Sequence, residues 1–130
     1  LQPAADKASP TPSAVFDEHE LLTRLMGDRK LAHKLVGSFL HDVPEKLAGL
    51  HRAVHDGDGE GIRREAHSLK GCAANLSAPI LKTLAVQLQQ AGTAQDLHHC
   101  AELVLQMESE FGRFQAALQQ ANWLQPGVNP

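Results

Sequence analysis

Aromatic residues are scarce in this chain: it has no tyrosine, one tryptophan and four phenylalanines, together 4% of its 130 residues. Strands favour aromatic and β-branched residues, and no segment alternates apolar and polar residues with the period of a strand. Hydrophobic residues nevertheless make up 42% of the chain. This composition argues against a β-sandwich and predicts helices that pack through leucine, alanine and valine.

Cysteine, long apolar runs and blocks of like charge are also rare. Cys72 and Cys100 fall within expected helices at no metal-ligand spacing, as reduced, packed thiols of a cytoplasmic protein do. No apolar run approaches the ~20 residues of a membrane span, and we expect no signal peptide. Net charge is −3 without a basic cluster, which argues against nucleic-acid binding. We therefore expect a cytoplasmic domain that binds no nucleic acid and makes no direct membrane contact.

Composition divides the chain into three parts. Residues 1–14 hold three prolines among alanine, serine and threonine, a composition typical of a linker from a preceding domain. The first residue is leucine rather than methionine, so we interpret the chain as a fragment of a longer protein. Residues 15–122 form the expected domain and 123–130 a polar tail, in which Trp123 and Leu124 are expected to pack back on the domain.

Helical periodicity and capping residues predict the elements of the central part. Pro44 interrupts the longest apolar run, and we expect one kinked helix there rather than two. Ser77 is the expected N-cap of the helix that starts near Pro79, and Thr93 opens a capping-box-like start of the last helix. The predicted fold is all-α, an antiparallel four-helix bundle with a short extra N-terminal helix. The expected helices span about 17–26, 29–54, 59–75, 79–92 and 94–121.

The stretch from Ala66 to Leu76 is the most informative part of the sequence. At helical period it places an apolar stripe on one side, formed by Ile62, Ala66, Leu69, Ala73 and Leu76. His67 lies off this stripe, one turn from Lys70 and Gly71. Glycine inside a helix costs about 0.5–1 kcal/mol relative to alanine. A glycine beside an exposed histidine therefore suggests that a large partner approaches the ring.

The segment His67-Ser68-Leu69-Lys70-Gly71, followed by Ala73-Ala74-Asn75-Leu76, closely resembles the signature of histidine-containing phosphotransfer (Hpt) domains. These helical bundles relay a phosphoryl group between the aspartates of response-regulator receiver domains. The resemblance runs from about Phe16 to about Leu118 and is typical of the C-terminal module of a bacterial hybrid sensor kinase. It implies that receiver domains, and kinase or receiver domains upstream in the same chain, are the partners.

The same resemblance implies the roles of individual residues. His67 would be the phosphoryl acceptor, Lys70 would balance the phosphoryl charge, and Gly71 would leave room for the receiver. The sequence has no Walker-type glycine-rich loop and no carboxylate cluster for Mg²⁺, so we expect a phosphoryl carrier rather than a kinase, with no cofactor or metal of its own and Mg²⁺ supplied by the receiver. Further binding residues are expected at Arg63, Arg64, Ser68, Ala74 and Asn75.

Three positions depart from the family pattern. Ser77 stands where a glycine commonly follows the Asn-Leu pair, Pro79 is unusual soon after it, and Gln89 replaces a typical glutamate. The first two concern the turn after the histidine helix, and none touches the phosphorylation motif. For receiver docking we expect an apolar patch on the face of the long helix nearest His67, around Leu35, Phe39 and Leu40. The spacing leaves open which of the three point outward.

Two alternatives remain open from the sequence. A helical adapter would dock a receiver without phosphotransfer, although a pure docking surface has no need of a histidine, a lysine and a glycine together. A His/Cys metal-binding bundle would hold zinc or haem, and His51 and His55, spaced i and i+4, could place two imidazoles on one helix face. No third ligand is evident for them, and Lys46, Arg52 and Asp56 mark that surface as solvated.

Overall fold

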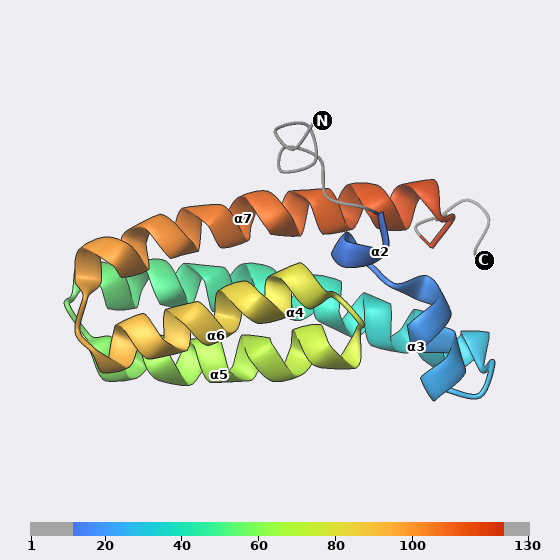
Figure 1. Ribbon diagram of the computed structural model, residues 1–130, viewed down its shortest axis with the longest axis horizontal. Coiled ribbons are helices and arrows are strands. Elements are labelled where there is room, and N and C mark those ends of the chain that lie inside the picture. The colour runs from blue at the N-terminus through green and yellow to red at the C-terminus, as the bar shows by residue number, and fades with distance from the viewer. Residues whose placement is uncertain (1–11, 124–130) are drawn as a thin grey trace, which may run out of the picture.

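The computed structural model describes residues 12–123, and all regular structure in that range is helical. Two short helices precede four long ones (Figure 1), which confirms the predicted all-α bundle. The sequence predicted a single short N-terminal helix, and the additional one is the four-residue α2. Most of the predicted linker and of the C-terminal tail, Leu124 included, lies outside the described residues. The helices are α2 (Pro12–Val15), α3 (Glu18–Arg24), α4 (Arg29–His55), α5 (Gly59–Asn75), α6 (Pro79–Thr93) and α7 (Leu97–Gln120).

Aspartates determine where four of these helices begin. The side chains of Asp17, Asp28, Asp58 and Asp96 each accept a hydrogen bond from the backbone N–H three residues later, at 2.9–3.2 Å. Such N-caps satisfy a donor that the first helical turn leaves free and contribute about 1 kcal/mol each. The chain then passes through Pro44 without a break, so α4 is one helix as predicted.

Two predicted caps are wrong. Thr93 is the last residue of α6, where its hydroxyl donates to the carbonyl of Gln89, and Asp96 caps α7 instead. Ser77 is not the N-cap of α6 either: it has a φ of +55°, in the left-handed region that ends α5, and Ala78 precedes the helix without a side-chain cap. A left-handed φ favours glycine, the residue that the resemblance described above leads one to expect at this position.

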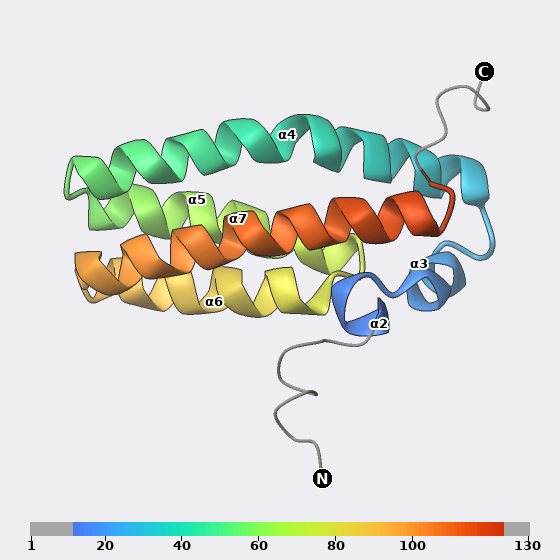
Figure 2. The same ribbon diagram turned by 90° about the horizontal axis from the view of Figure 1, so that it is seen from above.

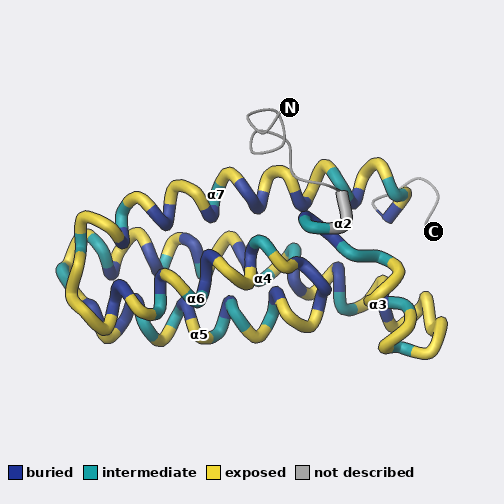
Figure 3. Tube along the Cα trace, in the orientation of Figure 1, coloured by how far each residue is buried: buried dark blue, intermediate teal, exposed yellow. Residues whose placement is uncertain are grey.

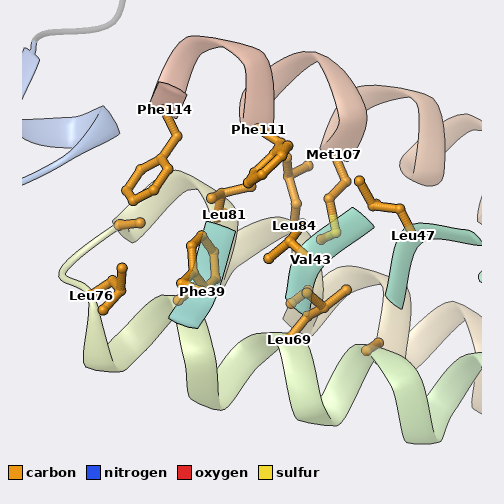
Figure 4. Packing of buried hydrophobic residues seen from close by; sticks show 14 of the residues in the cluster. Phe39, Val43, Leu47, Leu69, Leu76, Leu81, Leu84, Met107, Phe111 and Phe114 are labelled. Carbon is orange, nitrogen blue, oxygen red and sulfur yellow. The ribbon is translucent and has the colours of Figure 1, made fainter. Parts of the chain in front are cut away.

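The four long helices run alternately up and down around one core, as the two views in Figures 1 and 2 show. Buried side chains lie on the inner side of every long helix and exposed ones on the outer side (Figure 3). Phe39 and Val43 of α4 pack with Leu69 of α5 and with Met107 and Phe111 of α7 (Figure 4). Full burial of each such side chain contributes about 1.5–3 kcal/mol.

Helices α5 and α6 approach each other closely through two glycines. A Cβ atom added to Gly92 would lie 2.9 Å from the carbonyl oxygen of Gly59 and 3.1 Å from the backbone nitrogen of Arg63. Both distances are shorter than ordinary van der Waals contact, so neither helix has space for a side chain there. This contact fixes α5 in place along α6.

Aromatic side chains join the N-terminal segment to the other end of the bundle. The ring of Phe16 lies 5.5 Å from that of Phe114 and 5.8 Å from that of Trp123, each in an edge-to-face arrangement. Val15, Phe16 and Trp123 are all buried. Trp123 therefore packs on the bundle as expected, and α2 extends the ordered domain to residues N-terminal of position 15, where the predicted boundary lay. None of the helices within 12–123 is long and apolar enough to cross a bilayer.

Candidate functional site

The outer surface of α5 carries a strip of exposed positions with His67 at its centre. Gly71, Ala74 and Asn75 continue the strip toward the end of the helix, and Glu60 and Arg64 continue it toward the start. Ala66 and Leu69, on the opposite side, are buried in the core. The periodicity of the sequence thus predicted correctly which side of α5 faces out. Within residues 12–123, no hydrogen bond or ion pair holds the imidazole of His67.

Lys70 and Gly71 lie on the C-terminal side of His67, and this direction matters. Helical side chains point back toward the N-terminus, so a residue covers the surface over the preceding turn. The half-buried Lys70 therefore extends toward the level of the imidazole. A Cβ atom at Gly71 would have no neighbour within 4 Å in this chain, so the packing of the domain itself does not require a glycine there.

Arg63 and Arg64 lie on the N-terminal side of His67 and interact with Glu60. Arg63 donates two hydrogen bonds to the Glu60 carboxylate, at 2.9 and 2.7 Å, and Arg64 lies 3.7 Å from the same carboxylate. The hydrogen bonds from Arg63 lower the pKa of Glu60, and those bonds raise the pKa of Arg63. Both arginines thus interact with Glu60, and their role in binding stays a prediction.

Ser68 and Asn75 complete the predicted set. Ser68 is half-buried on the flank of α5 that faces α4, between Glu65 and Cys72. Asn75 is exposed in the last turn, and its backbone carbonyl accepts a hydrogen bond of 2.7 Å from Arg24 of α3. The structure therefore brings Lys70 and Gly71 next to His67, whereas Ser68 faces a neighbouring helix and Asn75 marks the end of the strip.

Arg24 is a residue that sequence reasoning missed. One nitrogen of its guanidinium contacts the Asn75 carbonyl, the Ala74 carbonyl at 3.3 Å and the Ser77 hydroxyl at 2.8 Å. A cation at the C-terminus of a helix satisfies free carbonyls and is favoured by the helix dipole. Because fifty residues separate Arg24 from Ala74, no local pattern in the sequence signals this contact.

A small hollow between α4 and α5 lies on the same flank of the strip as Ser68, with a volume of about 110 Å³. Leu35 lines it as expected, but Leu40 does not. Phe39 lines it too, yet only 5% of its surface is exposed, and its ring packs on Phe111 and Phe114 inside the bundle (Figure 4). The sequence left open which of these three residues point outward, and the rotation of α4 turns Phe39 inward. The hollow is lined by Leu35, Ser38, Phe39, Asp42, Cys72, Asn75 and Leu76.

The other histidines and the cysteines carry no competing site. His51 lies 2.7 Å from Glu108, a contact that joins α4 to α7. No group of three or more metal-ligating side chains occurs within residues 12–123. Cys72 and Cys100 are both free thiols, as expected, and burial raises the pKa of Cys100.

Comparison with known proteins decides the family. Residues 31–121 match the sequence model of the Hpt domain, which covers well over half of the chain. The chain belongs to the Hpt domain family. Hpt domains are phosphocarriers rather than kinases, and they act with receiver domains and kinases in the phosphorelays of two-component signalling.

The Hpt bundle is also similar to a solved structure, the crystal structure of histidine-containing phosphotransfer protein B (HptB) from Pseudomonas aeruginosa PAO1. The TM-score is 0.76 at 28% sequence identity, over 82% of this chain and 93% of the other. No curated protein sequence matches the chain. The likeness to HptB confirms both the fold and the role of a histidine phosphotransfer protein in two-component signalling.

Proposed function

We propose that His67 is the residue of this Hpt domain that accepts the phosphoryl group from a receiver aspartate and passes it to another receiver. The observation that carries this proposal is the position of the imidazole, exposed at the centre of the α5 strip with Lys70 beside it. Phosphoryl transfer requires mainly in-line access and charge compensation. An exposed ring on a rigid helix offers the first, and an adjacent ammonium group offers the second.

A neutral imidazole does not have to lose a proton before it accepts the phosphoryl group. A neutral imidazole has a free electron pair on one ring nitrogen near neutral pH. This pair forms the N–P bond while the P–O bond to the aspartate breaks, and the electrons of that bond leave on the carboxylate. We propose that Lys70 balances the charge of the phosphoryl group. Mg²⁺ prefers oxygen ligands, and neither the ammonium group of Lys70 nor the imidazole of His67 provides one. We therefore assign the Mg²⁺ to the receiver.

For docking we propose that the receiver covers the α5 strip and the hollow between α4 and α5. Leu35, Cys72 and Leu76 give this hollow an apolar floor, while Ser38, Asp42 and Asn75 give it a polar rim. Such a pattern is typical of protein interfaces. The open space at Gly71 lies within the same surface and would admit the rim of the receiver active site.

Transfer of label from a phosphorylated receiver tests the proposal. We expect the isotopic phosphate to appear on the Hpt domain in an acid-labile form and to be lost completely in His67→Gln. His98→Gln is the matched control, because its side chain is 89% exposed on α7, and it should retain full transfer. Label on any residue other than His67 would contradict the assignment. Receiver binding that is equal in both variants, without transfer to the unmodified domain, would favour an adapter.

A further inference from the structure

A carboxylate at the start of α5 holds two cations that lie one turn from His67. Glu60 accepts two hydrogen bonds from Arg63, at 2.9 and 2.7 Å, and lies 3.7 Å from a nitrogen of Arg64. Arg63 and Arg64 precede His67 by four and three residues, which is the spacing of neighbours on adjacent turns. The two guanidinium groups nearest to the imidazole in sequence thus share one carboxylate.

The imidazole of His67 extends toward the turn that carries these arginines. Helical side chains tilt toward the N-terminus, so a residue covers the surface over its preceding turn. For His67 that turn contains Arg63 and Arg64. A phosphoryl group on the ring would lengthen the side chain, while Lys70 approaches from the C-terminal side. The phosphoryl oxygens would therefore come within reach of a guanidinium group on a long side chain.

Glu60 holds the two arginines unequally. Arg63 meets the carboxylate through two hydrogen bonds, the forked geometry that makes such a pair strong, and its side chain is 36% exposed. Arg64 lies 3.7 Å from one oxygen, too far for a hydrogen bond, and its side chain is 62% exposed. The backbone of Arg63 also lies at the contact with Gly92 of α6. Arg64 is therefore the cation that Glu60 releases more easily.

A phosphoryl group is a stronger partner for Arg64 than Glu60 is. It carries close to two negative charges near neutral pH and offers three acceptor oxygens, whereas the carboxylate carries one charge and already binds Arg63. An exposed ion pair such as that of Arg64 with Glu60 contributes little, because both groups are well solvated. The guanidinium group can therefore change partners with little loss of free energy.

We propose that Arg64 leaves Glu60 and binds the phosphoryl group once His67 carries it, while Arg63 remains with Glu60. Arg64 is then a phosphoryl-binding residue, and Glu60 is a positioning residue that competes for it. This assignment rests on the proposed role of His67 as phosphoryl acceptor. Because Arg64 must separate from Glu60 before it binds, the competition keeps the phosphohistidine from becoming too stable to pass its phosphoryl group on.

Removal of one carboxylate tests the competition. At equilibrium with a receiver, Glu60→Gln is expected to raise the ratio of phosphohistidine to phosphoaspartate about three- to fivefold, toward the upper end of what an exposed ion pair supplies. Glu102→Gln is the matched control and should leave the ratio unchanged. It removes an equally exposed carboxylate, 57% against 58%, which lies near His98 and His99 on α7, a helix that packs against α4 and α6. Equal ratios in the two variants would overturn the competition.

Removal of the arginines shows whether Glu60 acts through them. Arg64→Gln is expected to lower the same ratio about three- to fivefold. In a variant that carries both Arg63→Gln and Arg64→Gln, the further change Glu60→Gln should have no effect, because no guanidinium group is left to release. A carboxylate that merely repelled the phosphoryl group would keep its full effect in that background, and this result would contradict the proposed competition.

Arginine side-chain signals identify the cation that moves. In domain labelled with ¹⁵N-arginine, phosphorylation should shift the guanidinium signal of Arg64 and leave that of Arg63 nearly unchanged, and neither should shift in His67→Gln. A shift of Arg63 as large as that of Arg64, or no shift of Arg64 while His67 carries label, would overturn the assignment of Arg64. Absence of label on His67 in the unmodified domain would instead refute the proposed role of His67.

Discussion

Helix α5 has two contrasting sides, and glycines show the difference most directly. At the contact with α6, the backbones of Gly59 and Gly92 are so close that a Cβ atom on either residue would collide with its neighbour. On the outer strip, a Cβ atom at Gly71 would meet no atom within 4 Å. The residue type is the same, but only the inner glycines are required by the fold.

The comparison separates two kinds of constraint on one helix. The inner side of α5 is determined by the helices that this chain supplies itself, whereas the outer side is free to match another molecule. Substitutions on the inner side should therefore change stability and leave the chemistry intact. Substitutions on the outer side should do the reverse.

Gly71→Leu is expected to give the largest effect. The leucine side chain would stand beside the imidazole and hold the receiver away, and a displacement of about 1 Å can slow a reaction by about 100-fold. Thermal unfolding should show no loss of stability, because the position is open and leucine favours helix over glycine. Gly112→Leu is the control, since Gly112 is equally open but lies on α7. Equal transfer rates for the two variants would mean that Gly71 provides no clearance.

Gly92→Ala should show the opposite pattern with a smaller effect. Its Cβ atom would lie 2.9 Å from the Gly59 carbonyl oxygen and 3.0 Å from a methyl carbon of Ile62. Overpacking of this kind destabilises a domain by about 1–3 kcal/mol, which denaturant unfolding measures. Phosphotransfer by the folded fraction should be unchanged. Gly112→Ala should instead stabilise the domain by about 0.5–1 kcal/mol, and a stabilising Gly92→Ala would show that the close contact is not rigid.

The two cysteines extend the comparison of buried and outer positions to the reactivity of thiols, where we expect the smallest difference. Cys100 is fully buried, and its pKa is raised by that burial and by the charge of Asp96. Only the thiolate reacts with alkylating agents, so Cys100 should need a higher pH than an ordinary thiol and should react only when the domain opens. Cys72 is half-buried at the hollow between α4 and α5 and should react first. Mass spectrometry of partly alkylated protein measures the order.

Much of the fold could be predicted because its determinants are local. Asp58 caps α5 and Gly57 has a φ of +68° before it, and both signals are visible in the sequence. Ser77 was misread as a helix start because its left-handed φ is unusual for a serine. Its contact with Arg24 depends on α3 folding back over the end of α5, which no local pattern encodes.

The candidate site divides in the same way. The motif and the helical period together identified His67, Lys70 and Gly71 as neighbours on one surface. The rotation of α4 was not predictable, because Phe39 belongs to an apolar stripe broad enough to turn either way. In the sequence Gln89 was only a departure from a family pattern, and it lines a hollow together with Lys70 because of the way α6 packs on α5.

The register of α5 against α6 gives the contact between Gly59 and Gly92 a further meaning. A slide of α5 by a single residue would move it 1.5 Å and bring residues that carry a Cβ atom to the contact, where such an atom would meet the backbone of the other helix. The contact therefore holds His67 at one fixed position along the axis of α6. We therefore expect a donor and an acceptor receiver to meet the imidazole at the same level of the bundle.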